Sequence, residues 1–130
     1  MENLFIAKTK YTPEIQFLIS GQLSIKGLSL LENSYEMYQK SIEWLRDFGK
    51  RPACNINLNL KLEYLDTSSV RSVVDIVKLL NSFKELGFKV RINWYYEKDD
   101  DDFYEIGEAM QYISKSEFNL VEKKPEDLSL

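Results

Sequence analysis

Three hydroxyl side chains stand together near the middle of the chain, at Thr67, Ser68 and Ser69. They follow a stretch of alternating apolar residues and precede a stretch with helical spacing, so they lie where a strand ends and a helix begins. α/β proteins commonly place their sites at such junctions. A helix N-terminus stabilises an anion by roughly 0.3–1 kcal/mol, so a phosphoryl group on one of these hydroxyls would be tolerated. A purely structural interpretation is also open, in which Thr67 or Ser68 caps the helix.

The chain lacks histidine and has a single cysteine, two residue types on which much enzyme chemistry depends. The chain has no histidine, which excludes the commonest general base near neutral pH and every histidine-bearing zinc site. Cys54 is the only cysteine, so no internal disulfide or paired-thiol site can form, and we expect a half-buried structural thiol. We therefore expect no catalytic residue, no cofactor and no enzyme activity.

An acidic run at Glu97 and Asp99 to Asp102 suggests a cation site at first sight. A calcium-binding EF-hand loop that began at Asp99 would need glycine and glutamate where this chain has Tyr104 and Met110. We expect instead an exposed loop whose last acids cap the next helix, with no metal ligand. A cation-binding or small-ligand-binding module that uses Asp99 to Asp102 remains an alternative.

Composition indicates one soluble globular domain. The 130 residues include 17 Lys and Arg against 21 Asp and Glu, so the net charge of −4 gives no reason to seek nucleic acid or an anionic membrane. The apolar run at residues 4–7 is too short for a signal peptide or a membrane span, which predicts a cytoplasmic protein.

Hydrophobic periodicity predicts strands at 56–64 and 88–96, with a helix between them at 68–86. Such a unit makes the two strands parallel, joined by a right-handed crossover. Because the strands alternate instead of being apolar throughout, we expect helices mainly on one face of the sheet and a partly open second face.

The other elements complete a two-layer α/β domain. We expect a short strand at 5–8, a hairpin that turns at Gly21, a helix that Asn33 caps and that stops at Gly49, a helix around 103–113 and a last strand at 118–121. The domain should span residues 1–124, and 125–130 should form a flexible tail.

The central helix is apolar around more than half of its circumference. Two interpretations are open: one face docks a partner, or the helix is central and neighbours cover it on both sides. Arg71, Asp75 and Lys78 should face solvent in either case.

Two motifs carry a family resemblance. The segment 64–69, Tyr-Leu-Asp-Thr-Ser-Ser, and the later Trp94-Tyr95-Tyr96 resemble the SiaC family of regulatory phosphoproteins, and the resemblance covers most of the chain. It implies a STAS-like fold with a mixed, mostly parallel sheet after an N-terminal hairpin. Asp66 stands where the family pattern usually has asparagine.

The resemblance also implies a non-enzymatic switch in c-di-GMP and biofilm signalling. A cytoplasmic serine/threonine kinase would phosphorylate Thr67, with Ser68 and Ser69 as secondary alternatives, and a metal-dependent phosphatase would reverse the reaction. The unphosphorylated form would bind and activate a diguanylate cyclase.

A partner should contact the junction and the start of the helix. The expected contact residues are Asp66, Ser68, Ser69, Val70, Arg71 and, on the later strand, Tyr95. A rival with the same fold, an anti-anti-sigma factor that captures an anti-sigma kinase, uses the same loop and stays open.

Overall fold

The computed structural model describes residues 1–30 and 35–124. Within these ranges the chain forms one six-stranded sheet, in which the strands lie in chain order, and three helices. The strands are β1 (Leu4–Ile6), β2 (Glu14–Phe17), β3 (Gln22–Ser29), β4 (Asn55–Leu65), β5 (Lys89–Tyr96) and β6 (Glu117–Glu122). The helices are α1 (Tyr35–Phe48), α2 (Thr67–Lys84) and α3 (Asp101–Ile113).

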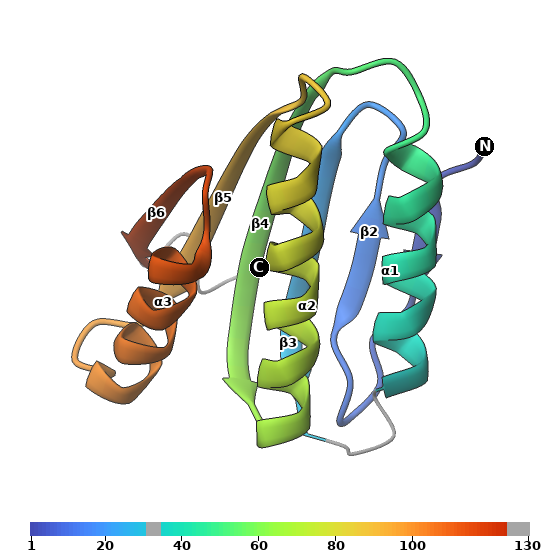
Figure 1. The fold of residues 1–130 in the computed structure, drawn as a ribbon. Coiled ribbons are helices and arrows are strands. Elements are labelled where there is room, and N and C mark those ends of the chain that lie inside the picture. Colours follow the sequence, from blue (N-terminus) through green and yellow to red (C-terminus); the bar gives the residue numbers. More distant parts are fainter. Residues whose placement is uncertain (31–34, 125–130) are drawn as a thin grey trace.

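The connections between the strands explain the two layers. β1, β2 and β3 pair antiparallel, and β3 to β6 pair parallel. Each parallel connection carries one helix and moves one strand further in the same direction, so right-handed crossovers place every helix on the same face. Figure 1 shows α1, α2 and α3 side by side in front of the sheet. The predicted two-layer α/β class is confirmed, and the STAS-like description is compatible with it.

The core lies between the sheet and the helices. Leu58, Leu60 and Ile92 of the sheet are fully buried, as are Val73 and Ile76 of α2. α2 is therefore the central helix, with α1 on one side and α3 on the other (Figure 1). As predicted, Arg71, Asp75 and Lys78 form its exposed side.

Trp94 of β5 anchors α3 to the sheet. Its indole stacks on Phe103, with ring centroids 4.8 Å apart, and its N–H donates to the Phe103 carbonyl at 3.2 Å. Gly107 allows this close approach, because a Cβ at that position would lie 2.5 Å from the Trp94 ring.

The open face of the sheet carries a ladder of side-chain amides. The Asn93 amide donates to Asn59 at 2.9 Å and to Asn57 at 3.1 Å, and Asn119 donates to Asn93 at 3.0 Å. Asn57 donates in turn to Gln22 at 3.2 Å. These bonds join β3, β4, β5 and β6 on the polar surface that the alternation predicted.

The structure corrects three sequence-based predictions. Tyr64 continues the alternation of its strand but is 52% exposed, because the β3–β4 register shifts after Gly27 and turns the end of β4. Cys54 is exposed instead of half-buried, since it precedes β4 in a loop. Ile19 continues the apolar alternation of the first strand of the predicted hairpin, but β2 ends at Phe17 and Ile19 is exposed.

Two further predictions lie outside the described residues: the Asn33 cap and the 125–130 tail. Among the helices of residues 1–30 and 35–124, none is long and apolar enough to cross a bilayer.

Candidate functional site

Thr67 is the first residue of α2 and is exposed at the end of the molecule where β4 stops. Within the described residues, no hydrogen bond engages its side chain. The Thr67 hydroxyl is thus accessible, and it belongs to the residue at the positive end of the α2 dipole.

Asp66, and neither Thr67 nor Ser68, caps the helix. Its backbone is extended (φ −80°, ψ 175°), and its carboxylate accepts a hydrogen bond from the Ser69 backbone N–H at 2.8 Å. The Ser68 hydroxyl donates to the same carboxylate at 3.3 Å. The cap therefore comes from the acid that the sequence analysis assigned to partner contact, and Thr67 is left available for other chemistry.

A buried cluster of hydroxyls lies beneath this turn. The oxygens of Ser29 and Ser69 lie 2.6 Å apart, and the Ser29 oxygen lies 2.9 Å from that of Tyr38. The cluster joins β3, α1 and α2. Burial raises the pKa of Tyr38 to about 12, so its phenol stays protonated.

Ser69 is fully buried. In this conformation neither a kinase nor a partner can reach its hydroxyl, and the geometry removes it from both roles that the sequence analysis allowed. Ser68 is half-buried and is engaged by Asp66, which leaves Thr67 as the most accessible of the three hydroxyls.

Val70 and Arg71 follow on the first two turns of α2. Arg71 is exposed and lies about one helical turn beyond Thr67, so the two side chains share the solvent side of the helix. Val70 is half-buried and packs against the core cluster. Val70 and Asn81 lie on the same side of α2, and the Asn81 amide donates a hydrogen bond to the Ile113 carbonyl at the end of α3. Val70 therefore lies on the side of α2 that faces α3.

Tyr95 is not brought together with these residues. Its neighbours Trp94 and Tyr96 contact α3, so Tyr95 points to the opposite, open face of the sheet. It is half-buried there beneath the Lys61 ammonium group, 5.1 Å from the ring centroid. A partner that covers the start of α2 would therefore reach Tyr95 only by wrapping around the sheet.

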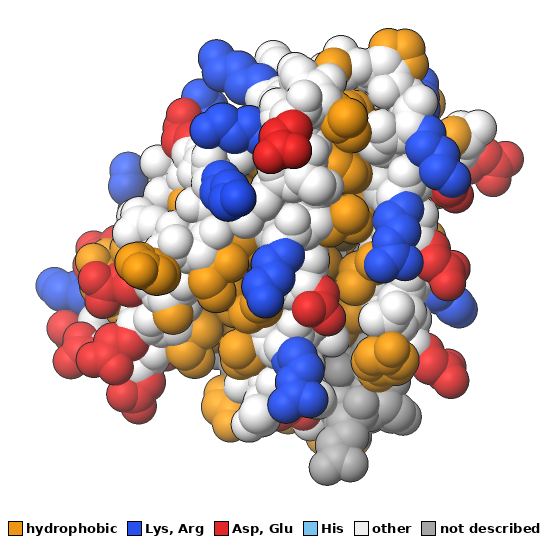
Figure 2. Space-filling model, in the orientation of Figure 1, with side chains coloured by type: hydrophobic (Ala, Val, Ile, Leu, Met, Phe, Trp, Pro, Cys, Tyr) orange, Lys and Arg blue, Asp and Glu red, His pale blue; other side chains and the backbone are white. Residues whose placement is uncertain are grey.

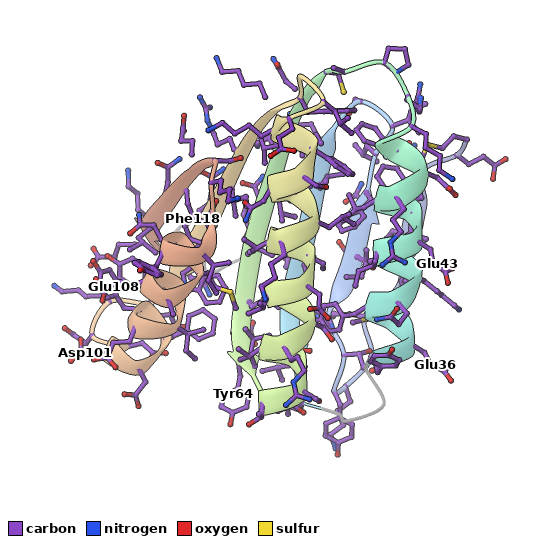
Figure 3. All side chains as sticks on the ribbon, viewed as in Figure 1. Glu36, Glu43, Tyr64, Asp101, Glu108 and Phe118 are labelled. Atoms are coloured by element: carbon purple, nitrogen blue, oxygen red, sulfur yellow. The ribbon has the colours of Figure 1, made fainter. Side chains whose placement is uncertain are left out.

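Sequence reasoning missed four exposed apolar side chains near Thr67. Figure 3 shows Tyr64 projecting from the end of β4 beside the start of α2. Tyr11 and Leu30 are tied to this end because the Leu30 N–H donates to the Tyr11 carbonyl, and the Asp66 N–H donates to the Ser29 carbonyl next to Leu30. Tyr35 begins α1 at the same end (Figure 1). We call Tyr11, Leu30, Tyr35 and Tyr64, which are between 36% and 59% exposed, the tyrosine rim.

The acidic loop behaves as a helix cap. The Asp100 carboxylate accepts from the Phe103 backbone N–H at 3.1 Å, and Asp101 and Asp102 occupy the first turn of α3. Among residues 1–30 and 35–124, no group of three or more acidic or cysteine side chains is placed to hold a metal ion.

The described geometry is that of a small α/β regulatory domain, with an accessible hydroxyl at a helix N-terminus and an apolar rim around it. The chain belongs to the SiaC family of regulatory phosphoproteins, whose family model matches residues 6–123.

Known relatives agree with this membership. The chain is 38% identical over 115 residues to the uncharacterised protein PA14_02130 of Pseudomonas aeruginosa strain UCBPP-PA14, a match that covers 85% of this chain and 89% of the relative.

Solved structures of Pseudomonas aeruginosa SiaC have the same fold. One superposes with a TM-score of 0.87 at 32% identity, covering 95% of this chain and 100% of SiaC. In another, SiaC is the activator bound to the diguanylate cyclase SiaD; the TM-score is again 0.87 at 32% identity, over 92% of this chain and 99% of that chain.

Proposed function

We propose that this protein is a non-enzymatic phospho-switch of the cytoplasm whose unphosphorylated form binds and activates a diguanylate cyclase. A serine/threonine kinase phosphorylates Thr67, and a metal-dependent phosphatase restores the hydroxyl. One observation carries the proposal: Thr67 is exposed, its hydroxyl is unengaged within the described residues, and the tyrosine rim lies at the same end. The relative SiaC, which activates a cyclase, supports the choice of partner.

The docking surface combines the tyrosine rim with the start of α2. Amphipathic tyrosine rings are favoured at protein interfaces because they bury a large apolar area while their hydroxyls remain hydrogen-bonded. Val70 and Arg71 extend the surface along the helix, and Asp66 and Ser68 lie at its centre. The cyclase would cover Thr67 when it docks here.

Phosphorylation would break this complex through charge and hydration. A phosphate adds about −1.5 to −2 charges at pH 7, next to the Asp66 carboxylate. The helix N-terminus tolerates the phosphate while it remains in water. Burying it against an apolar partner surface would remove its hydration without supplying a counter-charge.

Arg71 could form an ion pair with a phosphate on Thr67. It lies about one turn beyond Thr67, where a guanidinium can pair with a phosphate. Such a pair would present the phosphate to the phosphatase in a defined orientation. Arg71→Ala should therefore slow dephosphorylation more than it weakens binding of the unmodified protein to the cyclase.

The acceptor is tested by co-expression with the cognate kinase. Fragment mass spectrometry should locate one phosphate on Thr67, and Thr67→Ala should abolish the modification. Phosphate that persists on Ser68 in that variant would show that a different hydroxyl is the acceptor.

The switch is tested by direct binding and by cyclase activity. Unmodified protein should bind the cyclase and increase c-di-GMP synthesis, and stoichiometrically phosphorylated protein should do neither. Thr67→Glu serves as a first screen only, because a carboxylate carries one charge and is planar. Equal binding of the modified and unmodified proteins would refute the polarity of the switch.

The docking surface has a matched pair of variants. Tyr64→Ala, at the tyrosine rim, should weaken cyclase binding at least tenfold. Tyr112→Ala removes an equally large side chain that is 92% exposed on α3 and should leave binding unchanged. Co-purification of a sigma-factor regulator in place of a cyclase would favour the anti-anti-sigma alternative.

A further inference from the structure

A second polar site lies at the opposite end of the molecule from Thr67. An open pocket of about 530 Å³ forms where β4, β5 and β6 begin and α2 ends. Figure 2 shows Lys and Arg side chains gathered at this end, whereas acidic side chains gather over the 97–102 loop and α3. The pocket is lined by four cationic side chains and one acidic one: Lys84, Lys89, Arg91, Lys115 and Glu117.

The pocket keeps positive charge that the protein does not neutralise. Arg91 pairs with Glu117, with 2.7 Å between the guanidinium Nε and a carboxylate oxygen. Within the described residues, Lys89 and Lys115 have no carboxylate partner. A hydrogen bond from Asn119 and the nearby cations Arg91 and Lys89 lower the pKa of Glu117. This local excess of cations contrasts with the net charge of −4 of the whole chain.

Hydrogen bonds hold the wall of the pocket in place. Asn81 of α2 accepts from the Lys115 backbone N–H at 2.8 Å and donates to the Ile113 carbonyl at 3.0 Å. The Lys84 ammonium donates to the Lys115 carbonyl at 2.9 Å. These bonds hold the 114–116 turn against α2 before any ligand binds. Ligand binding would therefore cost little conformational entropy in this turn.

Ser116 places a buried hydroxyl beside the pocket. Its hydroxyl is the buried side-chain oxygen for which residues 1–30 and 35–124 provide no hydrogen-bond partner. An unpaired buried hydroxyl is unfavourable, and native proteins contain few of them. Ser116 also lines the pocket, but its Oγ is buried as it stands, so its side chain would have to change rotamer before a ligand oxygen in the pocket could pair with it.

We propose that this pocket binds a small molecule that carries phosphate, such as a nucleoside diphosphate. Lys89, Lys115 and the Ser116 hydroxyl would hold the phosphate, since cations and hydroxyls satisfy its oxygens. The amide of Asn55, which is exposed, remains for the rest of the ligand. The volume lies within the roughly 300–1,000 Å³ that is typical of small-molecule sites. This inference does not depend on the proposed switch at Thr67.

Calorimetric and NMR titrations with inorganic pyrophosphate and with GDP test the site. Both probes should bind saturably, with weaker binding at higher salt, and should shift the backbone amides of Lys89 and Ser116. The Lys89→Ala/Lys115→Ala double variant should bind at least tenfold more weakly. Lys40→Ala, which removes an exposed lysine on α1, should bind like the wild type.

Ser116→Ala separates a binding role from a structural one. The hydroxyl has no partner among the described residues, so its removal should leave the melting temperature unchanged or higher while it weakens pyrophosphate binding several-fold. The proposal fails if neither probe binds at millimolar concentration, if the double variant binds both normally, or if the shifts map to the start of α2. It also fails if an acidic peptide competes more strongly than either probe, because the site would then belong to a protein partner.

Discussion

The hydroxyl oxygens of Ser29 and Ser69 lie 2.6 Å apart, although 40 residues separate them in the chain. Ser29 ends β3, and Ser69 lies in the first turn of α2. The contact therefore sets the height of the helix N-terminus relative to the sheet, and with it the position of Thr67. Because both residues are fully buried, the turn that carries Thr67 is built on a buried polar cluster.

Because Asp66 caps α2 and Thr67 does not, alanine substitutions at the two positions should destabilise the protein by different amounts. Asp66→Ala removes the cap and should lower the free energy of unfolding by about 0.5–2 kcal/mol. Thr67→Ala removes an exposed side chain that makes no hydrogen bond within the described residues, and it should change the free energy of unfolding by no more than about 0.5 kcal/mol. Asp66→Asn should be nearly neutral, since asparagine caps equally well. Urea denaturation measures all three, and a large loss in Thr67→Ala would mean that its hydroxyl has a structural partner.

The raised pKa of Tyr38 predicts that the protein loses stability in alkali. Its pKa rises from 10.0 to about 12 in the folded protein, so the folded state holds the phenolic proton more tightly than the unfolded chain does. The stabilisation that comes from the raised pKa of Tyr38 is complete below about pH 10 and disappears as the pH rises toward about 12. The free energy of unfolding should therefore fall across that window, and less steeply in Tyr38→Phe than in the wild type. Tyr112→Phe, at an exposed position, is the control and should keep the wild-type slope.

Gly107 should be intolerant of alanine. In an ordinary helix interior, glycine to alanine is favourable by up to about 1 kcal/mol. Here the new Cβ would lie 2.5 Å from Trp94 and 2.9 Å from Leu120, so we expect a loss of about 1–3 kcal/mol from overpacking. Thermal denaturation and tryptophan fluorescence report the change. Glu108→Ala, at the adjacent exposed position labelled in Figure 3, should be close to neutral.

The acidic loop should be structural and independent of metal. Changing Asp99, Asp100 and Asp101 to asparagine keeps a capping side chain at position 100 and should alter the melting temperature only slightly. Asp100→Ala alone should cost about 0.5–2 kcal/mol because the cap is lost. Millimolar calcium should not raise the melting temperature of the wild type. A strong calcium-dependent rise that the triple variant lacks would restore the cation-site alternative.

Periodicity predicted the order of the elements because most buried positions recur at the spacing of a strand or a helix. The predicted helix at 68–86 and strand at 88–96 correspond to α2 and β5 within a few residues. Tyr64 was predicted incorrectly because β4 carries an extra residue, Glu63, opposite the step from Gly27 to Leu28 of β3, and the alternation of β4 does not reveal this bulge. Cys54 was predicted incorrectly because a small apolar residue in a short loop resembles one in a strand.

The candidate site was only partly predictable. The junction that carries Thr67 follows from local sequence, since a strand, polar residues and a helix succeed one another there. The depth of Ser69 does not, because burial depends on Ser29 and Tyr38, which come from other elements. Likewise, the basic pocket collects Lys84, Lys89 and Lys115 from three segments, and only the folded chain brings them together.

The order of the strands in the sheet bears on how the chain acquires its structure. Since β2 to β6 each pair with the strand before them in the chain, no strand has to await a distant partner. This topology closes short loops at its hairpins but a crossover of 20 to 25 residues at each parallel pairing, which makes the parallel pairings the slower steps. It also suits vectorial synthesis on the ribosome, because each strand can join the sheet's growing edge once its crossover helix has emerged. Among the described strands, β6 comes last in the chain and forms the edge of the sheet opposite β1.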